Sequence, residues 1–393
     1  MNGAPGKEAL NLEVLIESSA PVCAPALLGG DAPLIQIYTS GTTGTPKGVL
    51  VPISALASFQ IYLEFGLGVT PDDIYWNAAD PGWAYGLYYA VLAPLAAGVR
   101  STMYSGGFSP EATFRVLDEL AVTNFAAAPT IYRSLRVSSV QPQSKLRCAS
   151  SAGEPLTPEV NAWAVGALGV AVHDHYGQTE TGMLINNHQH QLLSEALHPG
   201  SMGKGMPGWQ PVILQLDNDE PAHPNTRGRL AMDLHESPLA WFSGYVGDVE
   251  KTREKLIGEG RWYLTGDVAQ MDEDSNFYFA SRDDDVIIMA GYRIGPFEVE
   301  SVILTHEAVA ECAAIAAPDE IRGEVLEVVV VLQPGTQPSD ELTVEIQTLV
   351  KTGFAAHAYP RHVHYVDALP KTPSGKIQRY LLKQQRQREL QPK

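Results

Sequence analysis

A loop rich in glycine and hydroxyl-bearing residues, within IYTSGTTGTPKGV at residues 37–49, has the composition of a phosphate-binding loop. Its backbone amides and hydroxyls can donate hydrogen bonds to phosphate oxygens, and its lysine adds a positive charge. The stretch departs from the P-loop pattern G-x-x-x-x-G-K-[ST], because Pro46 and Gly48 stand at two required positions. A polar turn without a ligand is the alternative. We predict phosphate binding by Thr39, Ser40, Gly41, Thr42, Thr43, Gly44 and Lys47.

A second polar segment, HDHYGQTETG at residues 173–182, follows the apolar run GVAV and is expected at the end of a strand. In α/β proteins ligands bind at such strand ends. The Glu180 carboxylate could hold Mg²⁺ against a polyphosphate, because Mg²⁺ prefers oxygen ligands. The His173 and His175 pair leaves zinc as an alternative, although no third ligand of suitable spacing is near.

Two turns combine acidic and basic residues. YLTGD ends an expected strand in Asp267, and SRDDD places Arg282 after the next hairpin. A carboxylate can accept hydrogen bonds from two sugar hydroxyls, and an arginine can add a third contact. The pair is therefore a candidate ribose site, with ordinary turn residues as the alternative.

A basic loop near the C-terminus, PKTPSGKIQR, places Lys376 beside a glycine and before an expected helix. A lysine in such a loop is either surface decoration or a charge that a moving segment delivers to a reaction centre. The loop alone does not decide between the two.

Two further glycine-containing stretches are less informative. GKGMPG at residues 203–208 matches G-x-G-x-x-G, but no strand is expected before it and Pro207 stands where a helix would begin. We therefore expect a loop that allows close packing. SAGEPL at residues 151–156 follows an expected strand, and it either precedes a helix or exposes backbone to a flat ring.

Composition limits the class of protein and its partners. The 393 residues are 45% hydrophobic and 18% charged, and their formal net charge is −18. These values are typical of a globular protein and argue against a nucleic-acid binder. The three cysteines are far apart, which fits a reducing compartment. No signal peptide or bilayer-spanning stretch is recognised, so we expect a cytoplasmic protein without a membrane span.

The hydrophobic patterning predicts an α/β fold with two domains. Helix and strand alternate from about residue 33, and β-hairpins follow from about residue 199, with DEDSN as one turn. Helix and strand alternate again after the charged run SRDDD. We expect a large domain of layered α/β sheets with a hairpin region at residues 1–283, and a small mobile α+β domain at residues 284–393.

Taken in order, these motifs resemble those of the adenylate-forming superfamily, over about residues 33–383. The matching stretches are YTSGTTGTPKG, ADPGWAYG, SAGEPL, YGQTETG, YLTGD, SRDDDVIIMAGYRIGPFEVES and PKTPSGKIQR. Within the superfamily, ADPGWAYG, HYGQTETG and GYRIGPFEVES are most similar to medium-chain acyl-CoA synthetases and benzoate-type CoA ligases.

The resemblance implies a two-step ligation that needs Mg²⁺ and uses ATP and CoA as co-substrates. A carboxylate attacks the α-phosphorus of ATP to give acyl-AMP and pyrophosphate, and the CoA thiol then displaces AMP. The chain would in the first step neutralise phosphate charge and hold the reactants in line.

The resemblance also implies a role for each matching residue. Catalysis would use Lys376, Thr179, Glu180 (also the Mg²⁺ ligand) and Arg293. ATP would further contact Gly153, Glu154, Pro155, Asp174, His175, Tyr176, Gly177, Gln178, Asp267 and Arg282. Asp284 would be the hinge of the small domain, and CoA would contact Ala290, Gly291 and Tyr292.

The acyl pocket implied by the resemblance would be lined by Trp83, Tyr85, Gly86 and Gly177. Gly177 lies where acetate-specific members carry a tryptophan, so a medium-chain or aromatic acid is expected. GWAYGLYYA offers no aspartate that would anchor an amino group, which argues against an amino-acid substrate.

Two departures from the family keep alternatives open. Relatives carry well over a hundred residues before the loop, whereas 37 precede Tyr38, and Ala358 stands where relatives often have lysine. A shortened homologue, a fragment or one half of a split enzyme would each fit, and a homodimer or partner chain could cover the lost edge. A non-catalytic nucleotide-binding remnant and an acyl-AMP ligase that delivers to a carrier protein are the functional alternatives.

Overall fold

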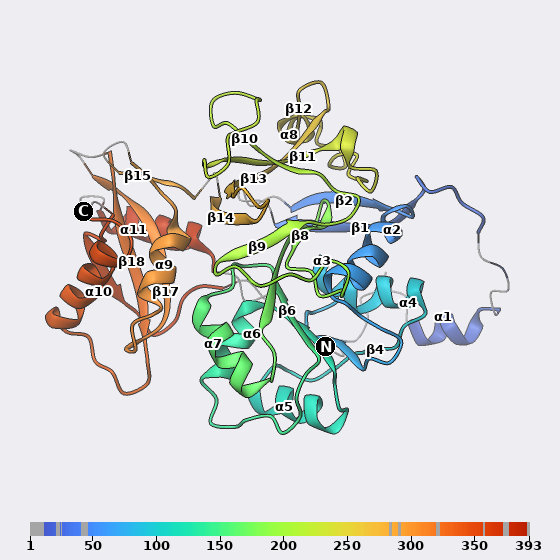
Figure 1. Cartoon of the computed structure of the whole chain (residues 1–393), viewed down its shortest axis with the longest axis horizontal. Coiled ribbons are helices and arrows are strands. Elements are labelled where there is room, and N and C mark those ends of the chain that lie inside the picture. Colours follow the sequence, from blue (N-terminus) through green and yellow to red (C-terminus); the bar gives the residue numbers. More distant parts are fainter. Residues whose placement is uncertain are drawn as a thin grey trace.

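A computed structural model describes residues 12–20, 24, 26–40, 46–282, 285–289, 292–319, 323–356, 358–371 and 377–390. The expected α/β fold is confirmed: helices cover a large mixed sheet, and a smaller α+β unit follows toward the C-terminus (Figure 1).

The largest sheet in the described part of the chain is mixed and has twelve strands. At one end the strands are parallel: β3 (Tyr75–Asn77), β4 (Ser101–Thr102), β5 (Asn124–Ala127), β6 (Cys148–Ala152) and β7 (Val172–Gln178). The others pair antiparallel: β8 (Gly182–Asn186), β9 (Ser201–Gly205), β10 (Pro211–Leu214), β11 (Gly228–Asp233), β12 (Leu256–Ile257), β13 (Trp262–Met271) and β14 (Phe277–Arg282). Pairing therefore changes direction between β7 and β8, where the polar segment 173–182 lies.

Helices make the crossovers between the parallel strands. The regular ones are α5 (Pro110–Glu119), α6 (Pro129–Arg136) and α7 (Pro158–Ala167), and each begins with proline, which suits the first helical position. The Ser109 side chain caps α5 by accepting a hydrogen bond from the Ala112 amide, 3.1 Å away. The starts of these helices are therefore marked by residues within their own first turn.

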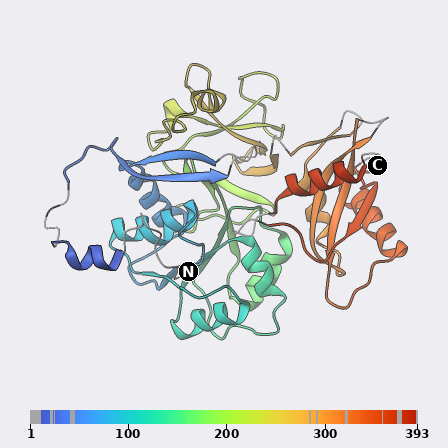
Figure 2. The ribbon, with the colours of Figure 1, turned by 180° about the vertical axis from the view of Figure 1, so that it is seen from behind.

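A second group of helices packs beside the sheet and carries the aromatic residues of the core. It contains α2 (Ala55–Ile61), the π-helix η1 (Tyr62–Gly66), α3 (Ala84–Gly86), the π-helix η2 (Leu87–Leu92) and α4 (Ala93–Ala97). The short elements α1 (Leu12–Ser18), η3 (Leu234–Glu236) and α8 (Val249–Lys255) complete the body. In Figure 2, α1 lies at the outer edge of the body.

The expected strand after residue 33 is confirmed as part of a separate hairpin. β1 (Pro33–Ser40) pairs antiparallel with β2 (Pro46–Pro52), and residues 41–45 between them lie outside the described residues. An isolated bridge joins Val49 of β2 to Tyr245 of the body.

The smaller unit has its own sheet and core. Its described strands are β15 (Ile287–Met289), β16 (Tyr292–Ile294), β17 (Val309–Asp319), β18 (Gly323–Leu332) and β19 (His362–Tyr365), with helices α9 (Pro296–Ile303), α10 (Asp340–Gly353) and α11 (Arg379–Leu390). It contacts the body through the Arg227–Glu298 ion pair and the Phe279 and Phe297 rings, whose centroids are 6.1 Å apart. Asp284 lies outside the described residues, so the boundary there stays a prediction.

The expectation of a loop across GKGMPG is wrong in its first half. Ser201–Gly205 forms β9, which pairs with β8 and β14. Gly203 has a φ of +93°, and a Cβ there would lie 2.1 Å from the Asn186 carbonyl oxygen. Glycine therefore allows the strands to approach closely, as expected of this stretch, but the element is a strand.

Among the residues that the structure describes, no helix combines the length and apolar character needed to cross a bilayer. Cys148 and Cys312 are buried free thiols, and no disulfide forms between them.

The Glu327→Gln variant tests the buried ion cluster that joins β18, β19 and α11. Burial opposes ionisation of Glu327, but hydrogen bonds from His364 and Arg386 lower its pKa from 4.5 to about 2. The ionised carboxylate therefore stabilises the fold above pH 4.5, and this contribution is lost as the pH falls toward 2. The free energy of unfolding in urea should be about 3 kcal/mol higher for wild type than for the variant at pH 6. This difference should narrow below pH 4.5.

The matched control is Glu389→Gln, because Glu389 pairs with the same Arg386 at the surface. This substitution should lower the free energy of unfolding by less than about 1 kcal/mol. A difference in unfolding free energy between wild type and Glu327→Gln that stays constant from pH 6 to pH 2 would contradict the prediction.

Candidate functional site

The candidate site lies where the parallel strands end and β13 returns toward them. β7 ends at Gln178, and residues 179–181 turn the chain into β8. β6 ends at Ala152 and is followed by Gly153, whose φ of +106° favours glycine. Two polar motifs therefore meet at the carboxyl ends of adjacent parallel strands, the usual ligand position in such sheets.

A hydrogen-bonded network joins the end of β7 to β13. The Gln178 Nε2 donates to the Thr265 carbonyl oxygen at 2.9 Å and to Asp267 Oδ2 at 3.0 Å. Its Oε1 accepts a hydrogen bond from the Tyr263 hydroxyl at 2.8 Å, and the Tyr176 hydroxyl donates to Asp267. The structure thus brings the predicted residues Tyr176, Gln178 and Asp267 together.

A β-bulge aims Asp267 into this network. The partner strand β11 shifts register between Arg229, opposite Val268, and Ala231, opposite Leu264. Gly266, within the bulge, has a φ of +81°, which side-chain-bearing residues rarely adopt. Asp267 is 4% exposed. The TGD motif therefore couples a glycine that permits the bulge to the carboxylate that the bulge redirects.

Arg282 stands opposite Asp267 on β14. The two residues are register partners, and Arg282 Nη1 lies 3.9 Å from Asp267 Oδ1. Arg282 is more exposed than Asp267. A carboxylate and a guanidinium are therefore adjacent at one edge of the site, as the ribose hypothesis requires.

Glu180 and Lys47 both lie close to Tyr245. The Tyr245 hydroxyl donates to Glu180 Oε1 at 2.7 Å, and Lys47 Nζ lies 5.0 Å from the centre of its ring. Lys47 also lines a cavity of about 290 Å³ together with Tyr38, Asp248, Lys251, Gln36, Pro46, Gly48 and Val246. The hairpin lysine and the strand-end carboxylate, far apart in sequence, thus belong to one region. The Tyr88 hydroxyl donates to the Thr179 carbonyl oxygen at 2.9 Å, which holds the turn.

The residues around Glu180 fit a Mg²⁺ ion that is shared with a nucleotide. The described residues contain no cluster of three histidine, cysteine or acidic side chains that could hold a metal by themselves. Mg²⁺ is usually bound by one or two carboxylates together with substrate phosphates and water. One carboxylate held in place by Tyr245 and a nearby lysine are compatible with that arrangement.

Asp174 connects the motifs of β6 and β7. Its Oδ2 accepts a hydrogen bond from the Leu156 amide at 3.3 Å, directly after SAGEP. Glu154, in the same segment, forms a 2.8 Å ion pair with Arg133 of α6. Pro155 lies between them. Burial raises the pKa of Asp174 to about 7.

The histidines of this segment face the interior. His173 Nδ1 and His175 Nε2 both donate to the Asn187 carbonyl oxygen, at 2.8 and 3.1 Å. Because Asn187 can only accept there, His175 Nδ1 is an acceptor for the Tyr62 hydroxyl at 2.8 Å. Burial lowers the pKa of His175 well below its usual value. The side chain of His175 is a structural link, and its assignment to ATP remains a prediction.

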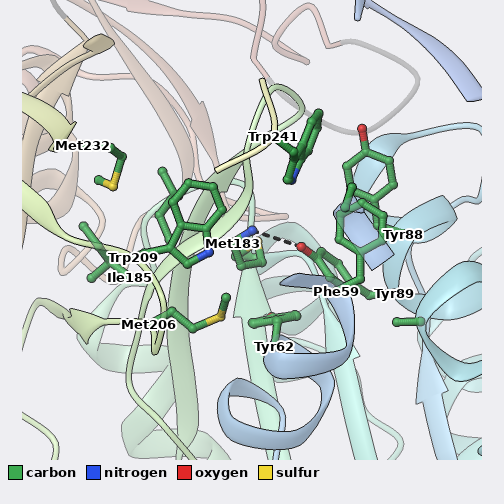
Figure 3. Close-up of a cluster of buried hydrophobic side chains, with 14 of the residues drawn as sticks. Phe59, Tyr62, Tyr88, Tyr89, Met183, Ile185, Met206, Trp209, Met232 and Trp241 are labelled. Carbon is green, nitrogen blue, oxygen red and sulfur yellow. Dashed lines mark hydrogen bonds between the residues drawn. The ribbon is translucent and has the colours of Figure 1, made fainter. Parts of the chain in front are cut away.

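The predicted acyl wall lies against an aromatic cluster. Figure 3 shows Phe59, Tyr62, Tyr88, Tyr89 and Trp241 side by side, with the Tyr89 hydroxyl accepting from the Met183 amide at 2.9 Å. The predicted wall residue Tyr85 meets this cluster through its hydroxyl, 3.0 Å from that of Tyr62.

Two predicted pocket glycines are sites of close backbone approach. A Cβ at Gly177 would lie 2.3 Å from the Gly182 carbonyl oxygen, and one at Gly86 would lie 2.2 Å from that of Asp80. The space beside Gly177 is therefore filled by β8 in this structure. Trp83 precedes α3 as its N-cap. The acyl-pocket assignment stays a prediction.

Several predicted residues cannot be placed. Those outside the described residues are Gly41, Thr42, Thr43, Gly44, Asp284, Ala290, Gly291 and Lys376, and the side chains of Ser40 and Arg293 are not described either. Thr39 pairs with Lys47 in the hairpin, and Tyr292 is 53% exposed on β16.

Sequence reasoning missed Tyr245, Tyr263 and Lys255 as members of the site. Tyr263 opens the YLTGD motif, where it is expected only as a strand residue, and Tyr245 follows a glycine in FSGY. Their hydroxyls complete the carboxylate and amide contacts described above. Tyr263 stands within an acidic motif, but tyrosines are too common for that to be informative, and no motif marks Tyr245 or Lys255.

The Asp174→Asn variant tests the buried carboxyl. Because the pKa of Asp174 rises from 3.8 to about 7 on folding, its contribution to stability is present below pH 3.8 and is lost as the pH rises through 7. Relative to the variant, wild type should lose about 4 kcal/mol of unfolding free energy between pH 4 and pH 8. Denaturant unfolding of both proteins at pH 4 and pH 8 measures this change in unfolding free energy.

Asp118→Asn is the control, because the carboxyl of Asp118 should contribute to stability with the opposite pH dependence. Backbone amides of Gln143 and Ser144 outweigh burial and lower the pKa of Asp118. Equal pH dependence in wild type and Asp174→Asn would contradict the assignment of a neutral buried carboxyl.

Comparison with known proteins gives the family. Residues 4–245 match the model of the AMP-binding enzyme family, and residues 298–376 match that of its C-terminal domain. The acetyl-coenzyme A synthetase of Bacillus subtilis (strain 168) is 40% identical over 88% of this chain, which spans 60% of the length of that relative.

Solved structures agree. An acyl-CoA synthetase of Brucella canis is 41% identical, with 99% of this chain and 71% of that chain covered and a TM-score of 0.69. A benzoate CoA ligase of Burkholderia xenovorans LB400 is 30% identical, with 94% and 72% covered and a TM-score of 0.83. The resemblance to the adenylate-forming superfamily is confirmed, and the chain belongs to the AMP-binding enzyme family.

Proposed function

We propose that this chain is an ATP-dependent acid–CoA ligase that works through an acyl-adenylate. The observation that carries the proposal is the hydrogen-bonded network of Asp267, Gln178 and Tyr176, with Glu180 two residues after Gln178 in the chain. Family membership supports it, as do the acetyl-CoA synthetase and benzoate CoA ligase among the similar proteins.

In the first step the acid's carboxylate oxygen attacks the α-phosphorus of ATP, and pyrophosphate leaves. Asp267 and Arg282 bind the ribose hydroxyls, while the segment Gly153–Pro155 and Tyr176 contact the adenine. Thr179 contacts the α-phosphate, Lys47 and the loop before it contact the outer phosphates, and Lys376 bridges carboxylate and α-phosphate. Glu180 would hold a Mg²⁺ ion together with the phosphates, and that ion would supply positive charge against the phosphate oxygens.

In the second step the CoA sulfur attacks the acyl carbon of the adenylate, and AMP leaves. Tyr292 and the preceding Ala290 and Gly291 contact CoA after residues 285–393 rotate about Asp284, whereas Arg293 contacts phosphate before the rotation. This sequence requires Lys376 to leave before CoA enters, which suits its place in a glycine-containing loop.

We propose a medium-chain or aromatic acid as substrate. Tyr85 is partly exposed and packs against the buried aromatic cluster, and it is the ring that such a group would contact. We also propose a reducing compartment, the cytoplasm, which suits the buried free thiols of Cys148 and Cys312.

The Lys376→Ala variant tests the proposal. Purified wild type with ATP, Mg²⁺, CoA and a panel of medium-chain and aryl acids should release AMP and form acyl-CoA. The variant should lose adenylate formation by about a hundredfold or more, because it lacks the charge that brings the two anionic reactants together. Its conversion of added acyl-AMP and CoA should be affected far less.

Substituting a phosphopantetheine-bearing carrier protein for CoA separates the two acceptors. Activity with the carrier protein but not with CoA would identify the protein as an acyl-AMP ligase that delivers to a carrier, in place of a CoA ligase. Absence of AMP formation with every acid and either acceptor would refute the proposed function.

A further inference from the structure

Lys255, the last residue of α8, is a cation that no matched motif includes. Its Nζ donates to the Thr265 carbonyl oxygen at 2.6 Å, the same oxygen that accepts from Gln178 Nε2 at 2.9 Å. It also lies 5.6 Å from the centre of the Tyr263 ring. The ammonium is therefore fixed inside the network that holds Asp267.

The position of Nζ is defined further by Gly266. A Cβ at this glycine would lie 3.2 Å from Nζ, so the ammonium passes over the bulge directly before Asp267. A side chain at residue 266 would crowd it. The bulge therefore has two consequences, because it redirects the carboxylate and leaves room for the lysine.

The ammonium keeps capacity for a ligand. An ammonium carries three N–H donors, and in the described part of the chain Thr265 provides the one acceptor that hydrogen-bonds to it. Burial lowers the pKa of Lys255, although Glu180 and Asp267 act in the opposite direction. A partly buried cation with unused donors is stabilised by an incoming anion.

The charged neighbours of Lys255 identify the part of the ligand that would reach it. Asp267 and Arg282 mark the proposed ribose end, whereas Glu180 and Lys47 mark the proposed polyphosphate end, and the Lys255 charge interacts with all four. In a nucleotide, the phosphate attached to the ribose lies between these two ends.

We propose that Lys255 is a binding residue for the ribose-linked phosphate of the nucleotide, the α-phosphate of ATP and the phosphate of AMP. The inference rests on the proposed use of ATP. Lys255 is a cation on the body of the enzyme and is anchored to the same strand as Asp267. It therefore remains beside this phosphate when the small domain rotates.

Calorimetric titration of the full chain with AMP and, separately, with adenosine tests the assignment. The Lys255→Gln variant keeps an N–H donor for Thr265 but removes the charge. AMP should bind this variant at least about tenfold more weakly than wild type, which is the scale of a lost charge-assisted hydrogen bond. Adenosine, which lacks the phosphate, should bind both proteins equally.

Two more variants separate phosphate recognition from a purely structural role. Lys255→Arg keeps the charge and should recover most of the affinity for AMP. Lys145→Gln is the matched control, because Lys145 Nζ also donates to backbone carbonyls, those of Gly166 at 2.9 Å and Ala167 at 2.8 Å, away from the site. It should leave the affinity for AMP unchanged.

The outcomes distinguish this inference from the function on which it rests. Equal weakening of AMP and adenosine in Lys255→Gln, or no weakening of either, would overturn the role of Lys255 while wild-type ligase activity stands. If wild type binds neither AMP nor ATP, the proposed function fails, and the role of Lys255 fails with it.

Discussion

The candidate site depends on hydrogen bonds between two strands that are not neighbours in the sheet. Three strands, β14, β9 and β8, separate β13 from β7. In a flat sheet, four spacings would place them about 19 Å apart, too far for one side chain to span. Yet Gln178 of β7 reaches the Thr265 carbonyl and the Asp267 carboxylate of β13. The sheet must therefore curl until its antiparallel part faces the ends of its parallel strands, and the network of Gln178, Thr265 and Asp267 depends on that curl.

The curl brings charged side chains together where solvent is limited, and neighbouring side chains pair with them. Buried Asp267 meets hydroxyl and amide donors together with the nearby Arg282 guanidinium. The Tyr245 hydroxyl orients Glu180, and Lys255 carries positive charge to the same corner. Such donors are worth more here than in water, because the low local dielectric strengthens each interaction. A preorganised cluster of this kind can receive a polyanion without first rearranging its own side chains.

Local signals predicted individual elements well. Ser109 and the helix-starting prolines of α5, α6 and α7 act through bonds within one helical turn, so the sequence reports them directly. The DEDSN turn between β13 and β14 was predicted for the same reason. The strand β9 was not, because its glycines are poor strand formers, and its pairing with β8 and β14 comes from the tertiary fold.

The sequence by itself determined the order of the motifs and hence the family, because Thr/Ser/Gly-rich, acidic and basic signatures in that succession are specific even when each alone is weak. It also indicated Asp267 and Arg282 as a candidate pair, and the structure places them opposite each other in a hairpin. Only the tertiary structure decided that Tyr245 holds Glu180 and that Lys255 reaches Thr265. It also decided that His175 faces the interior. The Tyr245–Glu180 and Tyr62–His175 contacts join segments that are far apart in the sequence, whereas Lys255 reaches Thr265 across the hairpin of β12 and β13. Residue types along one strand or helix do not encode either the direction in which a distant strand returns or the side chain that a turn brings close.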